Sequence, residues 1–155
     1  MTDASIMQNE NEIELLSFRL GEQEYCVDIM SVREIRGWAR ATPLPFAPPH
    51  VKGVINLRGT VLPVVDLSIR LGMPPIDAEE RNVIIVVSIG GRMAGLLVDA
   101  VSDIVAMRRE DMQPPPRLGD DPQSRCIDAL LLIDEKLIRV LDLGAVLENE
   151  QQDAA

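Results

Sequence analysis

The chain has few of the residues on which most enzymes depend for their chemistry. Its 155 residues include one histidine, His50, and two cysteines, Cys26 and Cys126. A Ser-His-Asp or Cys-His relay would have to use His50, which lies in a proline-rich loop. The cysteines are too few for a zinc site and too far apart for a C-x-x-C redox pair, so we expect reduced thiols in or near the core. We therefore expect no catalytic residues, no bound metal and no cofactor.

Basic charge, aromatic rings and long apolar runs are scarce as well. Lys and Arg total 15 against 25 Asp and Glu, a formal net charge of −10, and aromatic residues make up 3% of the chain. The acidic balance repels phosphate backbones and anionic lipids, and few rings are available for stacking on bases, which argues against a nucleic-acid binder. No apolar run exceeds five residues, whereas a membrane-spanning helix needs about 20. Met1–Glu14 has no secretory-signal pattern, so we expect a cytoplasmic protein.

Short apolar runs with a period of two dominate the rest of the sequence. They are rich in β-branched residues and are separated by Gly, Asp and Asn, a pattern typical of all-β chains built from hairpins. Only short helical segments fit between them, at Ile29–Glu34, Ser68–Gly72 and Gly144–Asn149. The pattern predicts four hairpins, formed by Glu14–Leu20 with Glu24–Asp28, Gly53–Leu57 with Thr60–Leu67, Asn82–Ile89 with Met93–Asp99, and Ala129–Ile133 with Lys136–Leu143.

The second and fourth of these hairpins are similar to each other, which indicates an internal repeat. A shift of 76 residues places residues 54–67 on residues 130–143, with eight positions apolar in both copies and Asp66 on Asp142. The repeat predicts two small related β-barrels, at about residues 13–72 and 81–147. They would form one domain, residues 13–148, with flexible tails at 1–12 and 149–155. Chance similarity between two hydrophobic hairpins is the alternative.

Four aspartates, Asp28, Asp66, Asp99 and Asp142, each follow an apolar run at corresponding places of the repeat. An aspartate in this position accepts hydrogen bonds from the N–H groups of the next helical turn, so we interpret all four as capping residues. A hydrolase with paired carboxylates would use the same residue type as acid and base, and it stays as the alternative.

Two segments combine charged and apolar residues in a way that is typical of protein-binding surfaces. In Asp28–Trp38, helical spacing places Ile29, Val32 and Ile35 on one side and Glu34 on another. Asn56 and Arg58 stand at the tip of the second hairpin, where a guanidinium offers a fixed fork to a carboxylate or carbonyl. Because no reactive group is evident, these segments indicate a protein-interaction module. A capped turn with a solvated charged face is the alternative in each case.

The same segments resemble the CheW family, the coupling proteins of bacterial chemotaxis. The similarity runs in order from about residue 13 to 148 and rests on three motifs. These are Gly21-x-x-x-Tyr25-x-Val27-Asp28-Ile29-x-x-Val32-x-Glu34-Ile35-Arg36-Gly37, then Lys52-Gly53-Val54-Ile55-Asn56-Leu57-Arg58-Gly59-x-x-x-Pro63-Val64-Val65-Asp66-Leu67, and Gly95-x-x-Val98-Asp99-x-Val101-Ser102-Asp103. The resemblance implies two SH3-like five-stranded barrels packed together and an adaptor without catalytic activity.

Members of that family bridge the cytoplasmic tips of transmembrane chemoreceptors and the regulatory domain of the histidine kinase CheA, in signalling arrays at the membrane. The resemblance implies a receptor groove between the barrels, whose residues by motif position are Val32, Glu34, Ile35, Asn56, Arg58, Val98 and Val101. No motif marks the kinase-binding residues, and the proline-rich stretch 110–125 matches no family motif. A structural or oligomerising β-module in a different two-component pathway, without a chemoreceptor partner, is the alternative function.

Overall fold

Two curved five-stranded sheets make up most of the protein in the computed structural model, which describes residues 11–77, 81–116 and 121–154. The first sheet contains, in spatial order, β8 (Ala100–Arg108), β1 (Glu12–Leu20), β2 (Gln23–Asp28), β10 (Lys136–Leu141) and β9 (Ile127–Ile133). The second sheet contains β3 (Val32–Gly37), β6 (Val83–Ile89), β7 (Arg92–Val98), β5 (Thr60–Asp66) and β4 (Val51–Leu57). The mostly β architecture predicted from the period-two pattern is confirmed.

All four predicted hairpins are present, because each apolar run is followed by a turn that brings the next run alongside it. They are β1–β2, β4–β5, β6–β7 and β9–β10. The sequence reasoning missed two strands, β3 and β8. Each pairs on one side only within its sheet, β3 with β6 and β8 with β1.

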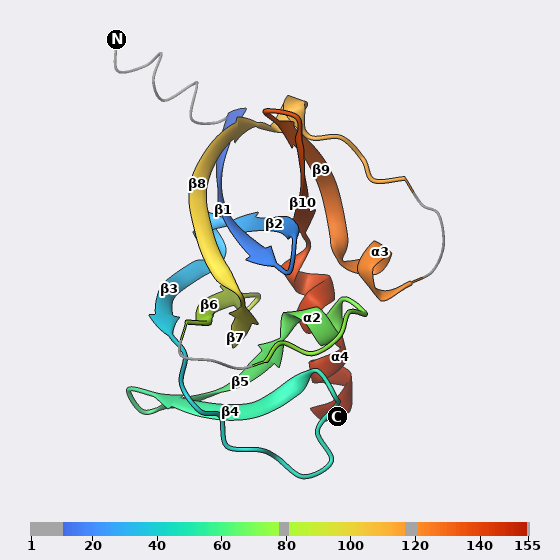
Figure 1. The fold of residues 1–155 in the computed structure, drawn as a ribbon. Helices are drawn as coiled ribbons and strands as arrows, with labels where there is room; N and C mark the ends of the chain where they lie inside the picture. Colours follow the sequence, from blue (N-terminus) through green and yellow to red (C-terminus); the bar gives the residue numbers. More distant parts are fainter. Residues whose placement is uncertain (1–10, 78–80, 117–120, 155) are drawn as a thin grey trace.

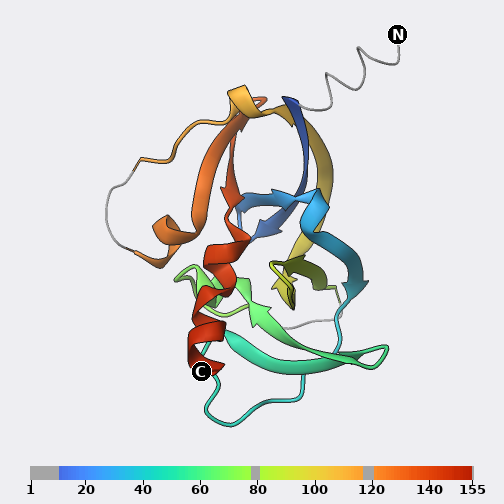
Figure 2. The ribbon, with the colours of Figure 1, turned by 180° about the vertical axis from the view of Figure 1, so that it is seen from behind.

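The helices of the described residues are short. They are η1 (Ile29–Ser31), α2 (Leu67–Arg70), η2 (Arg109–Asp111), α3 (Pro122–Cys126) and α4 (Leu143–Ala154). The expected helix at Ile29–Glu34 is wrong beyond η1, since β3 begins at Val32. Helix α4 starts where expected but continues to Ala154, through most of the segment expected as a C-terminal tail. Of the expected N-terminal tail, residues 1–10 lie outside the described residues. Figures 1 and 2 show β3, β8 and the β4–β5 turn along one side of the molecule and α3 and α4 along the other.

Each sheet takes strands from both halves of the chain, which corrects the expected division into barrels at residues 13–72 and 81–147. Strands β1 and β2 join β8, β9 and β10, whereas β3, β4 and β5 join β6 and β7. The chain changes sheet at η1 and again between β7 and β8. Parallel pairs, β2 with β10 and β5 with β7, then connect hairpins from different halves. The hairpins related by the 76-residue shift, β4–β5 and β9–β10, occupy the same two places in the two sheet orders.

In each sheet, one isolated bridge links the segment that follows one edge strand to the strand at the opposite edge. Thr42, in the segment after β3, pairs with Val54 of β4, and Gln113, in the segment after β8, pairs with Leu130 of β9. The amide of Thr42 donates to the carbonyl of Val54 at 2.8 Å, and that of Gln113 donates to the carbonyl of Leu130 at 2.9 Å. Because these segments join opposite edges, each sheet closes into a barrel. Part of the unassigned stretch 110–125 therefore closes the first barrel, while residues 117–120 lie outside the described residues.

The core is aliphatic and spans both barrels. A smaller cluster fills the first barrel and includes Ile13, Leu15 and Cys26. A larger cluster fills the second barrel and the space between the two, and it includes Phe18, Tyr25 and Cys126. Both cysteines are free and buried, as expected, and burial raises the pKa of the Cys26 thiol to about 12.

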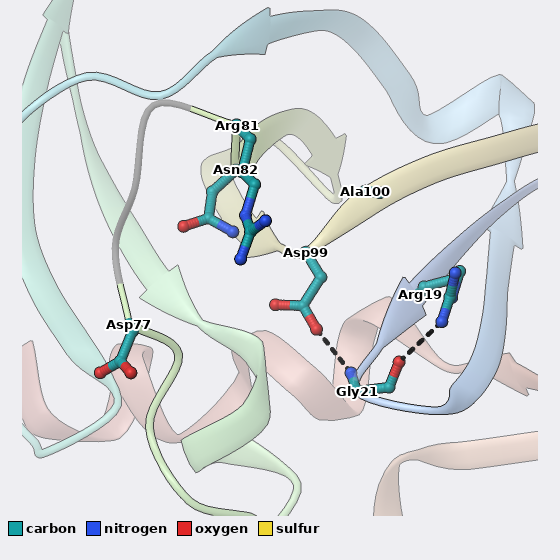
Figure 3. Close-up of a pocket in the computed structure, with 7 residues that line it drawn as sticks. All are labelled: Arg19, Gly21, Asp77, Arg81, Asn82, Asp99 and Ala100. Atoms are coloured by element: carbon teal, nitrogen blue, oxygen red, sulfur yellow. Dashed lines mark hydrogen bonds between the residues drawn. The ribbon is translucent and has the colours of Figure 1, made fainter.

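Three of the four aspartates cap the segment that follows them, as predicted. Asp28 accepts from the amide of Met30 at 2.9 Å, Asp66 from that of Ile69 at 3.3 Å and Asp142 from that of Ala145 at 3.2 Å. Asp99 differs, because its carboxylate accepts from the amide of Gly21 at 2.5 Å and so ties the β7–β8 junction to the β1–β2 turn (Figure 3). The prediction of a cap at Asp99 is therefore wrong.

Phe46, in the loop between β3 and β4, has a left-handed backbone with φ of 63° although its side chain is fully exposed. This conformation costs a residue with a Cβ about 1–2 kcal/mol, and asparagine tolerates it better than a bulky residue. We expect Phe46→Asn to raise the free energy of unfolding by about 0.5–1 kcal/mol, since the change removes no buried contact. Urea denaturation measures the change. Leu44→Asn, at an exposed position of the same loop without a positive φ, is the control, and an equal gain there would contradict the backbone explanation.

Candidate protein-binding site

An ion pair joins the two segments that the sequence singled out. The Arg58 guanidinium, at the β4–β5 turn, donates a hydrogen bond to the Glu34 carboxylate on β3. The Arg58 side chain is 73% exposed and that of Glu34 is 29% exposed, so the pair lies at the surface. The turn that carries Arg58 is fixed by Asn56, whose side-chain oxygen accepts from the amide of Gly59 at 2.9 Å. Glu34, Asn56 and Arg58 are thereby brought to one surface.

The charges of this pair are stable at neutral pH. The hydrogen bond from Arg58 holds the pKa of Glu34 below its ordinary value, and the same bond raises the pKa of Arg58. A carboxylate with a lowered pKa stays charged above its ordinary pKa and loses its charge only as acid brings the pH through the lowered value. The pair is therefore broken only under acidic conditions.

A register shift between Val32 and Glu34 interrupts the regular alternation of side chains along β3. Val32, Glu34 and Arg36 are half-buried, whereas Arg33 and Ile35 between them are exposed. Side chains of a strand point alternately to its two faces. Val32 pairs with Val87 and Ile35 pairs with Ile85, and these two partners share one face of β6. The expectation that Val32 and Ile35 share one side therefore agrees with the register, although the segment is a strand and not a helix. Ile35 is 46% exposed, and Val32 packs partly against the larger core cluster.

The two valines expected from the third motif have different surroundings. Val98, the last residue of β7, is fully buried in the larger core cluster. It cannot contact a partner in this fold, so its assignment to a groove is corrected. Val101 lies on β8 opposite Phe18 and is half-buried against the same cluster. Val101 therefore joins β8 to the core and is only partly accessible to a partner.

Two exposed apolar residues near this surface were missed. Ile104 on β8 is 53% exposed, and Met30 on η1 is 81% exposed. A hollow of about 550 Å³ lies between η1, the start of β1 and the end of β8, lined by Glu12, Ile13, Glu14, Asp28, Ile29, Met30, Ala106 and Arg109. Strand β8 escaped prediction because its apolar residues do not alternate, and so no signal pointed to Ile104. The third motif ends at Asp103, one residue short of it.

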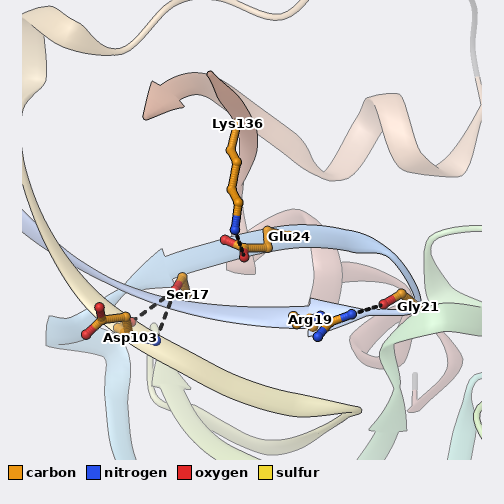
Figure 4. Close-up of polar contacts among 6 residues, drawn as sticks. All are labelled: Ser17, Arg19, Gly21, Glu24, Asp103 and Lys136. Atoms are coloured by element: carbon orange, nitrogen blue, oxygen red, sulfur yellow. Dashed lines mark hydrogen bonds and ion pairs between the residues drawn. The ribbon is translucent and has the colours of Figure 1, made fainter. Parts of the chain in front are cut away.

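Polar contacts hold β8 and the neighbouring hairpins in place (Figure 4). The Ser17 hydroxyl donates to the carbonyl of Asp103 at 3.1 Å and accepts from the Asp103 amide at the same distance, where the β1–β8 register shifts. Lys136 pairs with Glu24 at 3.5 Å across the parallel strands β10 and β2. The Ser17–Asp103 contacts hold β8, the strand that carries Val101 and Ile104, whereas the Lys136–Glu24 pair joins the two hairpins beside it.

A second hollow, of about 450 Å³, lies where the chain returns from the second sheet to the first. Its lining is polar and consists of Arg19, Gly21, Asp77, Arg81, Asn82, Asp99 and Ala100 (Figure 3). Arg19 and Asp99 both bind the backbone of Gly21 here, so these charges serve the turn. In the described part of the chain, no three His, Cys, Asp or Glu side chains gather as metal ligands would. No described helix is long and apolar enough to cross a membrane.

Comparisons with known proteins agree with this fold. The sequence profile of the CheW-like domain family matches residues 14–151. The chain is 48% identical to the chemotaxis protein CheW of Rhizobium meliloti over 155 residues, which cover both chains completely. It is 33% identical to the chemotaxis protein CheW of Klebsiella aerogenes over 89% of this chain and 83% of the relative. The crystal structure of the scaffolding protein TtCheW from Thermoanaerobacter tengcongensis is similar with a TM-score of 0.81 and 32% identity, covering 88% of this chain and 92% of that one.

Proposed function

The chain belongs to the CheW-like family of chemotaxis scaffolding proteins, and from this premise we propose that it couples the cytoplasmic tips of transmembrane chemoreceptors to the histidine kinase CheA. It would act by binding alone, without catalysis, and would work in the cytoplasm at membrane-associated receptor arrays. The observation that carries the proposal is the Glu34–Arg58 pair, which unites the first two family motifs at an exposed surface.

We call the receptor-binding surface the docking face and define it by Val32, Glu34, Ile35, Asn56, Arg58 and Val101. A receptor tip is a helical hairpin, and a helix docks by placing apolar side chains on an apolar surface while polar groups pair at its rim. Ile35 supplies exposed apolar area, Val32 and Val101 are half-buried against the larger core cluster, and the exposed Glu34–Arg58 pair supplies the polar groups. Arginine in such a position is a frequent determinant of affinity.

The kinase is proposed to bind elsewhere on the molecule, through its regulatory domain. Adaptor activity requires that receptor and kinase be held at the same time, so their sites must not overlap. Titration calorimetry of the protein against a cognate receptor cytoplasmic fragment, and separately against the kinase regulatory domain, tests the bridge. Binding to both is the expected result. Binding to neither, together with self-association in light scattering, would favour an oligomerising β-module instead.

Arg58→Glu is expected to weaken binding of the receptor fragment by about 10- to 100-fold, that is about 1–3 kcal/mol. The change places two carboxylates side by side and removes the guanidinium from the docking face. Calorimetric titration measures the loss. The fold is expected to persist, because Arg58 is exposed and reversing its charge leaves no polar group buried.

Asp134→Arg is the matched control for this prediction. Asp134 stands at the corresponding turn of the first barrel, 76 residues after Arg58, with φ of 48° against 51°. A charge reversal there is expected to leave receptor affinity within about twofold, as is usual for residues outside a binding hot spot. Equal losses in the two variants, or unchanged affinity in a folded Arg58→Glu variant, would refute the docking face.

A further inference from the structure

The chain around β3 and β4 is basic within an acidic protein. Residues 29–76 contain six basic and two acidic residues, whereas the whole chain has a net charge of −10. One of those two acidic residues, Asp66, is fully buried with Lys52 3.9 Å away, and among the basic residues Arg70 is buried too, which leaves Arg33, Arg36, Arg40 and Arg58. The other acidic residue, Glu34, is already paired with Arg58. This part of the surface therefore attracts negatively charged groups, although the protein as a whole repels them.

Arg36, in this basic region, has a buried side-chain nitrogen without a hydrogen-bond partner among the described residues. It lies on β3 two residues after Glu34 and therefore on the same face of the strand. The buried nitrogen is the guanidinium Nε, a hydrogen-bond donor. A buried donor without a partner is unfavourable, so natural structures keep few of them.

Glu34 does not satisfy Arg36. The Arg36 charge helps to lower the pKa of Glu34, which places the two groups within electrostatic range. The Glu34 carboxylate nevertheless receives its hydrogen bond and its ion pair from Arg58. Two guanidinium groups thus share one carboxylate, and the cluster keeps one positive charge in excess.

We propose that Arg36 is a specificity-determining residue of the docking face that binds a carboxylate, the side chain of an Asp or Glu on the docked receptor helix. A guanidinium binds a carboxylate through two parallel hydrogen bonds, which fixes geometry as well as charge. The incoming carboxylate balances the excess charge of the cluster. The inference rests on the proposed function, since it names the chemistry that the receptor presents to this face.

The test compares two variants of the same strand. Arg36→Gln removes the guanidinium that shares Glu34 with Arg58, whereas Arg33→Gln removes an equal charge from an exposed position of β3 that does not act on Glu34. Both are titrated against the cognate receptor cytoplasmic fragment at several salt concentrations. We expect Arg36→Gln to weaken binding about tenfold or more and to flatten its salt dependence, and Arg33→Gln to stay within about twofold of the unmodified protein. Circular dichroism and thermal unfolding confirm that both are folded.

Further measurements separate the inference from the function on which it rests. Arg36→Lys keeps the charge but not the fork, so an affinity between those of the unmodified protein and Arg36→Gln is expected. This variant also tests the inference if Arg36→Gln does not fold.

A double-mutant cycle with Glu→Gln and Asp→Asn variants of the receptor fragment should show energetic coupling between Arg36 and one carboxylate. Equal losses for Arg36→Gln and Arg33→Gln, or no loss for either, would overturn the inference while leaving the adaptor function intact. Failure of the unmodified protein to bind the fragment would overturn both.

Discussion

Asp66→Ala is expected to lower the free energy of unfolding by about 3–4 kcal/mol, the range typical of a broken buried polar network. The Asp66 side chain is fully buried and accepts from the amides of Ile69 at 3.3 Å and Ile76 at 3.0 Å. Lys52 lies 3.9 Å from the same carboxylate. The substitution therefore leaves two amides without an acceptor, and it uncouples β5, α2 and the segment after α2. Urea denaturation measures the loss.

Asp142→Ala is the matched control, because the internal repeat places Asp142 at the corresponding strand end. Asp142 is exposed and accepts one hydrogen bond, from the amide of Ala145. Water replaces that acceptor once the carboxylate is removed, so we expect a loss of about 1 kcal/mol, as for an ordinary capping residue. Similar losses at the two positions would contradict the role assigned to Asp66.

Gly53→Ala is expected to destabilise the protein by about 4 kcal/mol, at the upper end of single-residue effects. Gly53 lies on β4 with φ of 148°, and a Cβ there would overlap the Thr42 carbonyl and come within 2.9 Å of the Pro43 nitrogen. These are backbone atoms, which cannot rotate away as a side chain does. Thr42 also forms the bridge to Val54 that closes the second barrel, so the clash opens this closure.

Gly59→Ala separates steric overlap from backbone conformation. Gly59 also has a positive φ, 89°, but an added Cβ would meet nothing within 4 Å. Only the conformational penalty applies, and we expect a loss of about 1 kcal/mol. Thermal unfolding of both variants gives the comparison. If Gly53→Ala were no worse than Gly59→Ala, the close approach of β4 to the Thr42 segment would not exist in solution.

Local pattern was sufficient to predict the hairpins but not β3 and β8, the two strands that belong to no hairpin. Strands of a hairpin are adjacent in sequence, so their alternation and the turn between them are visible together. In β3, Val32 and Ile35 are three residues apart, which imitates a helical turn. In β8, Val101 and Ile104 have the same spacing. Both strands pair with a strand distant in sequence, β3 with β6 and β8 with β1, so their own residues carry little of the signal.

The candidate site was predicted in part for the same reason. Asn56 and Arg58 were found because a hairpin tip is a local feature. The family motif pointed to Glu34, but only the fold brings it to Arg58. Val98 was assigned to the surface wrongly, because a run of apolar residues does not reveal that both faces of β7 are covered. Ile104 was not predicted, and Arg36, although part of the first motif, was not assigned to the groove, since exposure and an unpaired Nε are properties of the folded chain.

The sequence by itself determined the all-β class, the aliphatic core, the repeat of hairpins and the family. These follow from which side chains avoid water and from the residues that permit turns. Only the tertiary structure decided which strands share a barrel, because strands are joined by backbone hydrogen bonds that are the same for every residue. The β1–β2 hairpin of the first half lies in the barrel of β8, β9 and β10, and the β6–β7 hairpin of the second half lies in the barrel of β3, β4 and β5. The sequence pattern does not reveal this exchange. That exchange sets the chain crossings at η1 and Asp99, after which β3 and β8 carry residues of the proposed docking face.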